Sequence, residues 1–252
     1  MSKCLIVTGG GRGIGAEVSR KAAKQGYSVC VNFHRDQTSA QKLVRELEEE
    51  GANALAYQAD VSQEEEVVAL FQTVEKHLGT PEALVNNAGI LDLQTRVDGM
   101  NAERIQRIFA VNVTGSFLCA REAVKRMSTK YGGKGGSIVN LSSGAAKYGS
   151  PGEYVDYAAS KAAIDTLTIG LAKEVAEEGI RVNAVRPGFI DTEIHQSGGE
   201  PDRMERVRPL VPMKRVGQAE EVADAIMWLL SDKASYTTGT VSYTHLTLPT
   251  TE

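Results

Sequence analysis

The sequence predicts an α/β fold, a single domain built on a doubly wound parallel sheet with helices on both faces. Apolar runs of strand length alternate with longer helical patterns along nearly the whole chain, an order typical of parallel sheets with right-handed crossovers. The strand-length runs are continuously apolar, which indicates strands that are covered on both faces. With 252 residues and no linker or repeat before the C-terminus, the chain suits one domain with a substantial core.

Each strand-length run precedes a helical pattern that is long enough to carry the chain to a neighbouring parallel strand. The expected strands are residues 4–8, 28–33, 54–58, 83–86, 137–141 and 181–185. The expected helices are residues 14–25, 37–50, 63–78, 101–130, 157–178 and, shorter, 219–230.

The composition is ordinary for a globular protein and argues against several classes of function. The net charge of −4 disfavours a nucleic-acid or anionic-membrane partner, because either would favour a basic surface. No apolar run approaches the roughly 20 residues that span a bilayer. Cys4, Cys30 and Cys119 are widely spaced in apolar segments, so we expect buried free thiols in a reducing cytoplasm. The four histidines are scattered, and no metal site is expected.

A glycine-rich turn follows the first expected strand directly. Residues 8–15 read Thr-Gly-Gly-Gly-Arg-Gly-Ile-Gly, and a helix begins there. Glycines permit a tight turn and let the backbone approach a pyrophosphate, while the helix N-terminus supplies amide donors. A plain strand-to-helix turn is the alternative, but the position in the first βαβ unit favours a Rossmann-like dinucleotide site. The residues expected to bind the cofactor here are Gly9, Gly11, Arg12, Gly13, Ile14 and Gly15.

The spacing Gly-x-x-x-Gly-x-Gly resembles the short-chain dehydrogenase/reductase family rather than the usual Rossmann pattern. Three further stretches match that family in order: Asn-Asn-Ala-Gly at 86–89, Tyr-Ala-Ala-Ser-Lys at 157–161 and Pro-Gly at 187–188. The resemblance covers roughly residues 3–241 and implies a nicotinamide-dependent alcohol/carbonyl oxidoreductase. It also implies cofactor contacts from Asp60, Val61, Asn87, Ala88, Gly89, Pro187, Gly188, Ile190 and Thr192.

Tyr157 and Lys161 are four residues apart and share one face of an expected helix. A nearby ammonium lowers the pKa of a tyrosine, so Tyr157 could exchange a proton with a substrate oxygen. An isolated Tyr-x-x-x-Lys would fit an ordinary amphipathic helix equally well, and the glycine turn upstream favours the catalytic interpretation. Tyr154 has no lysine four residues later, and we expect it to line the pocket or pack at the helix start.

The resemblance adds two catalytic residues and a second role for the tyrosine and lysine. Of the serines after the fifth strand, Ser143 is expected to hold the substrate carbonyl, with Ser142 as the alternative because the loop to Tyr157 is about one residue longer than usual. Asn112 is expected to hold a water that extends a proton relay from Lys161; a purely structural asparagine is the alternative. Tyr157 and Lys161 are also expected to contact the cofactor.

The choice of cofactor depends on the end of the second strand, where NAD enzymes usually carry an acid for the ribose 2′-hydroxyl. Residues 31–36 read Val-Asn-Phe-His-Arg-Asp, and Asp36 comes about three residues too late. Arg12 and Arg35 together could bind a 2′-phosphate, unless both are solvated surface charges. We therefore expect a preference for NADP, with NAD as the alternative.

Residues 193–212 are irregular, and the family places a mobile substrate lid there. The polar side chains Glu193, His195, Glu200 and Arg203 favour a polar substrate such as a sugar. Residues 150–157 are similar to members of the glucose dehydrogenase type. A 3-oxoacyl thioester reductase is the rival enzyme, and a non-catalytic dinucleotide-binding sensor is the alternative from another class.

The helix from Tyr157 is apolar around much of its circumference, so one face is expected to meet another subunit. The family resemblance implies contacts through this helix and residues 101–130, and we expect a homotetramer. Residues 242–252 lack the apolar-Asp-Gly-Gly ending typical of the family, and Pro249 is poorly placed for a strand. We interpret the domain as residues 1–241 and the tail as non-native, similar to translated sequencing-adapter sequence; a genuine divergent tail is the alternative.

Overall fold

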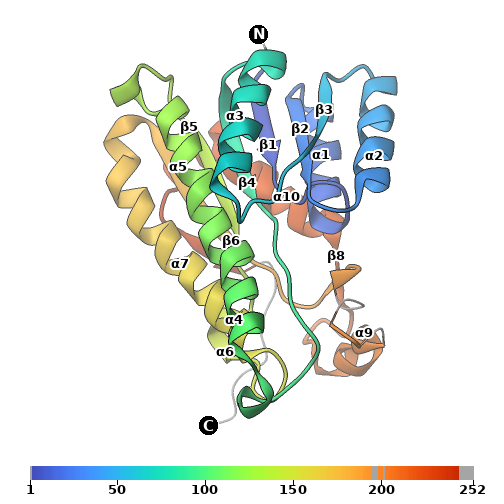
Figure 1. Ribbon diagram of the computed structural model, residues 1–252. Helices are drawn as coiled ribbons and strands as arrows, with labels where there is room; N and C mark the ends of the chain where they lie inside the picture. The colour runs from blue at the N-terminus through green and yellow to red at the C-terminus, as the bar shows by residue number, and fades with distance from the viewer. Residues whose placement is uncertain (1, 195–197, 201, 244–252) are drawn as a thin grey trace.

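The computed structural model describes residues 2–194, 198–200 and 202–243, which form the expected layered α/β fold (Figure 1). Seven parallel strands lie in the order β3-β2-β1-β4-β5-β6-β9. This confirms the doubly wound parallel sheet. The strands are β1 (Cys4–Val7), β2 (Ser28–Phe33), β3 (Ala54–Gln58), β4 (Pro81–Asn86), β5 (Gly136–Leu141), β6 (Ile180–Arg186) and β9 (Val241–Tyr243).

Helices cover both faces of this sheet. The cluster on one face contains side chains of α1, α2 and α10, and the cluster on the other contains side chains of α3, α5 and α7. The bounds are α1 (Gly13–Lys24), α2 (Gln37–Glu49), α3 (Glu64–Leu78), α4 (Ala102–Phe109), α5 (Gly115–Met127), α6 (Ala145–Tyr148), α7 (Val155–Val175), α9 (Arg203–Val207) and α10 (Ala219–Leu230).

Alternate residues of β1 show why the strands are continuously apolar. Leu5 and Val7 belong to one core cluster, whereas Cys4 and Ile6 belong to the other. Successive side chains of a strand point to opposite faces, and both faces here are dry. Each fully buried Leu or Ile contributes about 1.5–3 kcal/mol of transfer free energy. A buried polar residue in this sheet needs hydrogen-bond partners, as Asn32 and Asn140 have.

Local signals explain several helix ends. Asp36 precedes α2 and its carboxylate accepts a hydrogen bond from the Ser39 amide at 3.0 Å, which satisfies an N–H that the helix leaves free. Three glutamates occupy the first turn of α3, where they complement the helix dipole. Asn101 caps α4 through the Arg104 amide in the same way.

The prediction of one continuous helix over residues 101–130 is wrong in its middle. The segment Ala110–Thr114 is a π-helix between α4 and α5. The wider turn places Asn112 fully inside the protein, and such turns frequently occur at functional sites. Apolar periodicity could not reveal it, because one extra residue in a turn changes the periodicity only slightly.

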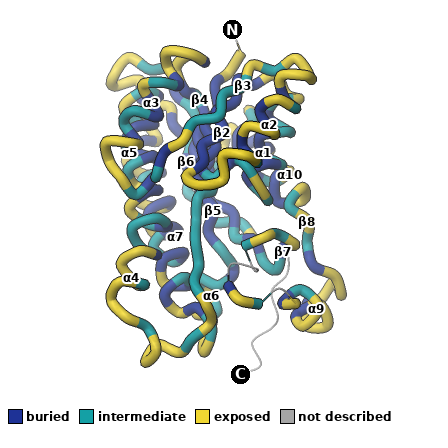
Figure 2. Tube along the Cα trace, turned by 45° about the vertical axis from the view of Figure 1, so that its right-hand side comes forward, coloured by how far each residue is buried: buried dark blue, intermediate teal, exposed yellow. Residues whose placement is uncertain are grey.

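The sheet order reverses between β1 and β4, and ligands of such sheets bind beyond the carboxyl ends of the strands at this point. The loops there include the glycine turn, residues 87–101, residues 142–154 and the described parts of residues 187–216 (Figures 1 and 2). Within residues 193–212, which were expected to be irregular, the structure has the short helix α9, and on either side of this segment β7 (Ile190–Asp191) pairs in parallel with β8 (Gly217–Gln218).

Residues 241–243 form β9, which pairs with β6, so Ser242 and Tyr243 of the atypical tail lie in the sheet; residues 244–252 lie outside the described residues. All three cysteines are buried free thiols, as expected, and burial raises the pKa of Cys4 and of Cys119 to about 12. No helix in the described part is long and apolar enough to cross a membrane. The described residues also contain no cluster of ligands suited to a metal ion.

Candidate active site

A cleft of about 1430 Å³ opens beyond the carboxyl ends of the strands. Ordinary small-molecule pockets measure about 300–1,000 Å³, so this one has room for a dinucleotide and a substrate together. Its wall includes every predicted site residue except Gly15 and Asn112. Residues from six separate loops therefore meet at one site.

The glycine turn has the conformation that its sequence requires. Gly9 and Gly13 have φ angles of 59° and 51°, a region that side chains with a Cβ rarely adopt. Gly15 lies behind the turn, and a Cβ there would stand 2.5 Å from the Gly9 carbonyl oxygen. Asn32 holds the turn from β2, because its Oδ1 accepts from the Gly9 amide at 3.3 Å. The turn is thus a preformed cradle with exposed backbone, which fits a pyrophosphate.

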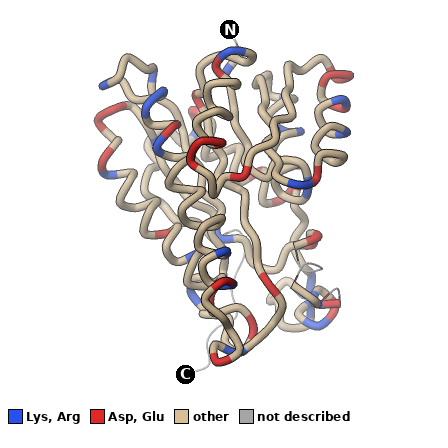
Figure 3. The backbone as a smooth tube through the Cα atoms, viewed as in Figure 1, with Lys and Arg blue, Asp and Glu red and all other residues tan. Residues whose placement is uncertain are grey.

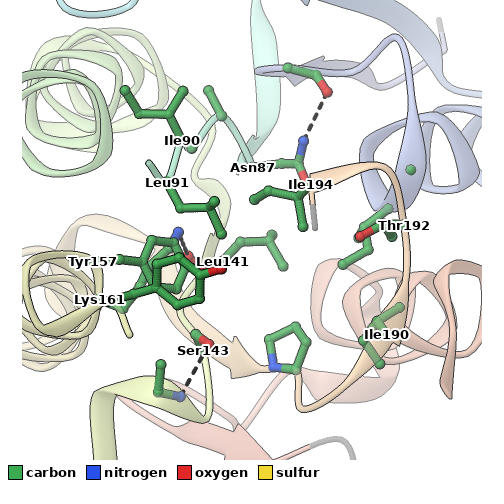
Figure 4. Close-up of a pocket in the computed structure, with 18 of the residues that line it drawn as sticks. Asn87, Ile90, Leu91, Leu141, Ser143, Tyr157, Lys161, Ile190, Thr192 and Ile194 are labelled. Atoms are coloured by element: carbon green, nitrogen blue, oxygen red, sulfur yellow. Dashed lines mark hydrogen bonds between the residues drawn. The ribbon is translucent and has the colours of Figure 1, made fainter. Parts of the chain in front are cut away.

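The segment after β4 is tied to this cradle. Thr8 Oγ1 accepts from the amides of Asn87 and Ala88, both at 3.0 Å. The side-chain amide of Asn87 donates to the carbonyls of Thr8 and Gly9, both at 2.9 Å (Figure 4). A Cβ on Gly89 would lie 3.3 Å from Lys161 Nζ. These contacts explain why the stretch reads Asn-Asn-Ala-Gly.

Tyr157 and Lys161 lie on one face of α7 and point into the cleft (Figure 4). Lys161 is 4% exposed, and its Nζ donates to the Leu141 carbonyl at 2.6 Å. Burial lowers the pKa of Lys161 to about 8, and the charge of Asp165 opposes this shift. Lys161 Nζ lies 5.7 Å from the centre of the Tyr157 ring.

The expected lowering of the Tyr157 pKa by Lys161 is wrong for this structure. Burial raises the pKa of Tyr157, and the opposing contribution comes from a hydrogen bond with Ser143. The physical reason is that the ammonium hydrogen-bonds the Leu141 carbonyl rather than the phenol oxygen. Tyr157 therefore favours its protonated form, which can donate a proton.

The two serines after β5 have different surroundings. Ser143 lies at the cleft beside Tyr157, and its Oγ accepts from the Ala145 amide at 3.1 Å (Figure 4). Ser142 is buried, and its Oγ donates to the Lys161 carbonyl at 3.2 Å. Of the two, Ser143 is the one positioned beside the tyrosine hydroxyl.

Asn112 is completely buried behind the cleft. Its Oδ1 accepts from the Ile90 amide at 2.8 Å, and its Nδ2 donates to the Ile90 carbonyl and to Ser160 Oγ. Its own carbonyl accepts from Ser116 Oγ at 3.0 Å. Every polar atom of the side chain thus binds protein, and the contacts join the segment after β4 to α7 one residue before Lys161.

The residues expected to select the cofactor lie at the adenosine end. Arg12 and Arg35 are exposed and line the cleft. Asp36 lines it too, but its carboxylate caps α2; the Ser39 hydrogen bonds, and then Arg12, lower its pKa. Toward the other end, Gly144 donates its amide to the Pro187 carbonyl at 2.8 Å. Thr192 lies beside Gly13.

An ion pair next to Tyr157 was not foreseen from the sequence. Arg104 Nε lies 2.7 Å from Asp156 Oδ2, and the two side chains are 10% and 2% exposed. Asp156 Oδ1 also accepts from the Tyr157 amide at 2.9 Å, and Arg104 Nη1 donates to the Leu93 carbonyl. The only sequence signal for this pair is the acidic residue Asp156 directly before Tyr157.

Tyr154 lies at the start of α7, lines the cleft as expected, and donates its hydroxyl to the Gly198 carbonyl at 3.1 Å. His195, which suggested a polar lid, lies outside the described residues. Several apolar cleft residues were also not foreseen, and their only sequence signal is their place in loops after strand ends. They are Ile90, Leu91, Ala145, Tyr148, Phe189, Val207, Leu210, Val211 and Pro212.

Comparison with known proteins agrees with this cleft and fold. The family model described as enoyl-(acyl carrier protein) reductase matches residues 9–245. The crystal structure of 3-ketoacyl-(acyl-carrier-protein) reductase from Brucella melitensis complexed with NADH superposes with a TM-score of 0.88 at 30% identity, covering 96% of each chain. The chain belongs to the short-chain dehydrogenase/reductase family.

Three curated relatives cover nearly the whole chain. An uncharacterized oxidoreductase, YgfF, of Escherichia coli K12 is 59% identical over 93% of this chain and 95% of its own length. The 3beta-hydroxysteroid dehydrogenase 1 of Eggerthella lenta is 40% identical over 96% and 91%, and glucose 1-dehydrogenase 2 of Bacillus subtilis is 38% identical over 94% and 91%. This protein is thus an NAD(P)-dependent oxidoreductase that binds a nicotinamide dinucleotide.

Proposed function

We propose that the protein transfers hydride between NADP(H) and an alcohol or carbonyl substrate, with Tyr157 as the general acid/base. The observation that carries the proposal is the meeting of Tyr157, Ser143 and Lys161 on one cleft wall, beside a glycine cradle that a Cβ would fill. The dinucleotide supplies or accepts the hydride when bound. The protein's residues orient the substrate oxygen and manage its proton.

Tyr157 performs the proton transfer in this proposal. Because burial keeps the phenol protonated, it donates to the oxygen of a carbonyl as that oxygen gains negative charge. Ser143, hydrogen-bonded to Tyr157, holds the same oxygen. In the direction of oxidation, the phenol oxygen must first lose its proton, and the ammonium of Lys161 stabilises that state once its Nζ turns from the Leu141 carbonyl.

Asn112 supports this arrangement from behind the cleft. Its contacts to Ile90 and Ser160 hold the segment after β4 at a fixed distance from α7. This geometry favours the structural role for its side chain. The water relay that the family resemblance implies remains a separate prediction for the space beside Lys161.

The preference for NADP rests on the charges at the adenosine end. Arg12 and Arg35 are two exposed guanidinium groups on the cleft wall, and the carboxylate of Asp36, which follows Arg35, is engaged in capping α2. Guanidinium groups match phosphate oxygens well. Asp60 and Val61 line the same end, where the adenine ring would lie.

Two narrower substrates have specific support. Glucose 1-dehydrogenase 2 of Bacillus subtilis, at 38% identity, favours a sugar. The Brucella melitensis reductase, at 30% identity, favours a 3-oxoacyl thioester. The same proposed catalytic residues would act on a sugar and on a 3-oxoacyl thioester. A panel of both substrate types, assayed with NADPH and NADH, therefore distinguishes the two functions.

Replacement of Tyr157 by Phe tests the proposal and separates it from a non-catalytic sensor. General acid/base catalysis contributes typically 10²–10⁴-fold, so kcat for a turned-over carbonyl substrate should fall by at least about 100-fold. The phenyl ring keeps the packing, so the Kd for NADPH, followed by cofactor fluorescence, should change by less than about threefold. Turnover equal to that of the wild type would refute the assignment.

We further propose that residues 1–241 act as one domain, with residues 193–212 as the substrate lid, and that the protein is a homotetramer. The helices α4 and α7 pack against each other, and α5 contacts α7. Large apolar side chains stay exposed on all three: Ile105, Phe117, Val155 and Ile169 are 36–50% exposed. Such a group of apolar side chains on neighbouring helices is typical of a surface that a second subunit covers.

A further inference from the structure

The wall of the cleft beyond Tyr157 and Ser143 is mainly apolar; we call this region the substrate end. The glycine turn and the ends of β2, β3 and β4 line the opposite end, which suits the dinucleotide. The substrate end is formed by described residues of the loops after β4, β5 and β6, and residues 203–212 belong to the last of these loops. Its apolar side chains include Leu91, Phe189, Val207, Leu210, Val211 and Pro212.

Four charged side chains beside this end form a closed network, which we call the clasp: Glu153, Glu200, Arg203 and Arg206. Arg203 lies 2.6 Å from Glu153 and 2.9 Å from Glu200. Arg206 lies 3.0 Å from Glu153 and 2.5 Å from Glu200. Two cations meet two anions, so the clasp has no net charge.

Polar and aromatic groups around the clasp are also engaged in contacts within the protein. Arg203 is 8% exposed and its guanidinium lies over the rings of Tyr154 and Phe189, at 5.2 and 5.8 Å from their centres. The Tyr154 hydroxyl donates to the Gly198 carbonyl. Asp92 and Arg107, the other charged pair on this wall, bind each other. Among the charged side chains that the described residues of these loops bring to the cleft, only Lys161 and the carboxylate of Glu193, which lies near Gly13, are therefore without an ion-pair partner.

Two physical consequences follow for a substrate. A carboxylate or phosphate would lose its water here without gaining a cation other than Lys161. A polyhydroxylated body would find the unpartnered hydroxyl of Tyr148 and the catalytic hydroxyls among side chains that are mainly apolar. Each methylene buried against the apolar wall, in contrast, raises affinity by roughly fourfold. The wall therefore accommodates uncharged, apolar substrate groups.

We infer that the substrate is an uncharged ketone or secondary alcohol with a mainly apolar, alicyclic or alkyl body, and that the clasp enforces this choice. The inference rests on the proposed function, because it places the reacting carbon beside Tyr157 and Ser143. Within that function it disfavours the sugar that the polar residues 193–203 suggest. Of the charged residues that suggest a polar lid, Glu200 and Arg203 neutralise each other within the clasp, where basic and acidic residues lie side by side at α9 (Figure 3).

Matched ketones test the substrate class directly. Methyl 4-oxocyclohexanecarboxylate and the free 4-oxocyclohexanecarboxylate have the same ring and carbonyl and differ in charge. With NADPH, kcat/KM should be at least about 100-fold higher for the ester, and 2-decalone should exceed cyclohexanone by at least about tenfold. An acid that is turned over as well as its ester, or a decalone no better than cyclohexanone, overturns the inference.

A change in the clasp tests the cause. Glu153→Gln keeps the size of the side chain but leaves Arg203 and Arg206 with one carboxylate between them, so the ester-to-acid ratio should fall by about tenfold toward the acid. Glu64→Gln is the matched control. It removes a carboxylate on α3 from an ion pair with Arg121 on α5, and it should keep the wild-type ratio. An unchanged ratio in Glu153→Gln overturns the role of the clasp.

Binding measurements separate this inference from the proposed function. With NADP⁺ present a ketone cannot be reduced, so calorimetry gives the Kd of ester and acid without turnover. Ester binding at least tenfold tighter than acid binding supports the apolar, uncharged class even where turnover is absent, and the absence of turnover then counts against the proposed function alone. Equal Kd values for the two ketones overturn the inference even where both are reduced.

Discussion

The ion pair between Arg104 and Asp156 allows a quantitative test of how the first turn of α7 is held. Asp156 accepts from Arg104 Nε at 2.7 Å, from Arg104 Nη2 at 3.3 Å and from the Tyr157 amide at 2.9 Å. The replacement Asp156→Ala removes all three hydrogen bonds. It leaves the nearly buried guanidinium of Arg104 with the hydrogen bond that it donates to the Leu93 carbonyl. Breaking a buried pair from one side costs about 3–5 kcal/mol, and because one partner remains we expect about 3 kcal/mol.

Urea unfolding followed by circular dichroism measures this loss, and the midpoint of thermal unfolding should fall by about 6–12 °C for a protein of this size. The double variant with Arg104→Met should cost less than the sum of the two single variants, because no charge is then left unpaired. The exposed pair Arg96–Asp98, with side chains 78% and 69% exposed, is the control. Asp98→Ala should change stability by less than about 0.5 kcal/mol.

A loss below about 1 kcal/mol in Asp156→Ala, equal to that of Asp98→Ala, would refute the assignment of a buried, structurally important pair. So would single variants whose costs add fully in the double variant. The activity of Asp156→Ala provides a second check. Since Asp156 binds the backbone of Tyr157, kcat should fall together with stability, while the Kd for the cofactor at the distant glycine turn should stay within about twofold.

Three further predictions concern the cofactor, the buried lysine and the assembly. Arg12→Ala combined with Arg35→Ala should lower kcat/KM for NADPH by about 10- to 100-fold, because bonds to charged groups contribute about 1.5–3 kcal/mol; an equal change with NADH in steady-state assays would contradict the NADP preference. Burial lowers the pKa of Lys161 from 10.5 to about 8, so between these pH values the unfolded chain binds more protons and stability rises with pH. Denaturant titrations of wild type against Lys161→Met should show that gain, at most about 1.4 kcal/mol per pH unit, and a falling difference would show the sign to be wrong. Phe117→Glu on the exposed face of α5 should reduce the tetramer to smaller species in light scattering, and an unaltered mass would exclude this helix from the interface.

The sequence by itself determined the features that depend on neighbours along the chain. Continuous apolar runs specify doubly covered strands, and the order of strands and helices specifies a parallel doubly wound sheet; the order of the strands and the seventh strand, β9, came from the structure. The glycine turn and the pairing of Tyr157 with Lys161 are local as well, since four residues on a helix share a face. Motif order then brought Ser143 and Asn112 into the expected site.

Only the tertiary structure decided what depends on residues far apart in the chain. Glu153 and Arg203 are separated by 50 positions and Arg104 and Asp156 by 52, and no periodicity records such pairs. The direction of the Tyr157 pKa also changed, because burial and the Leu141 carbonyl, neither visible locally, outweigh a lysine one turn away. Of the charges that suggest a polar lid in the sequence, Glu200 and Arg203 neutralise each other in space. The chain thus specifies its fold and its proposed catalytic residues largely through local patterns, whereas the surroundings of the substrate end depend on long-range contacts.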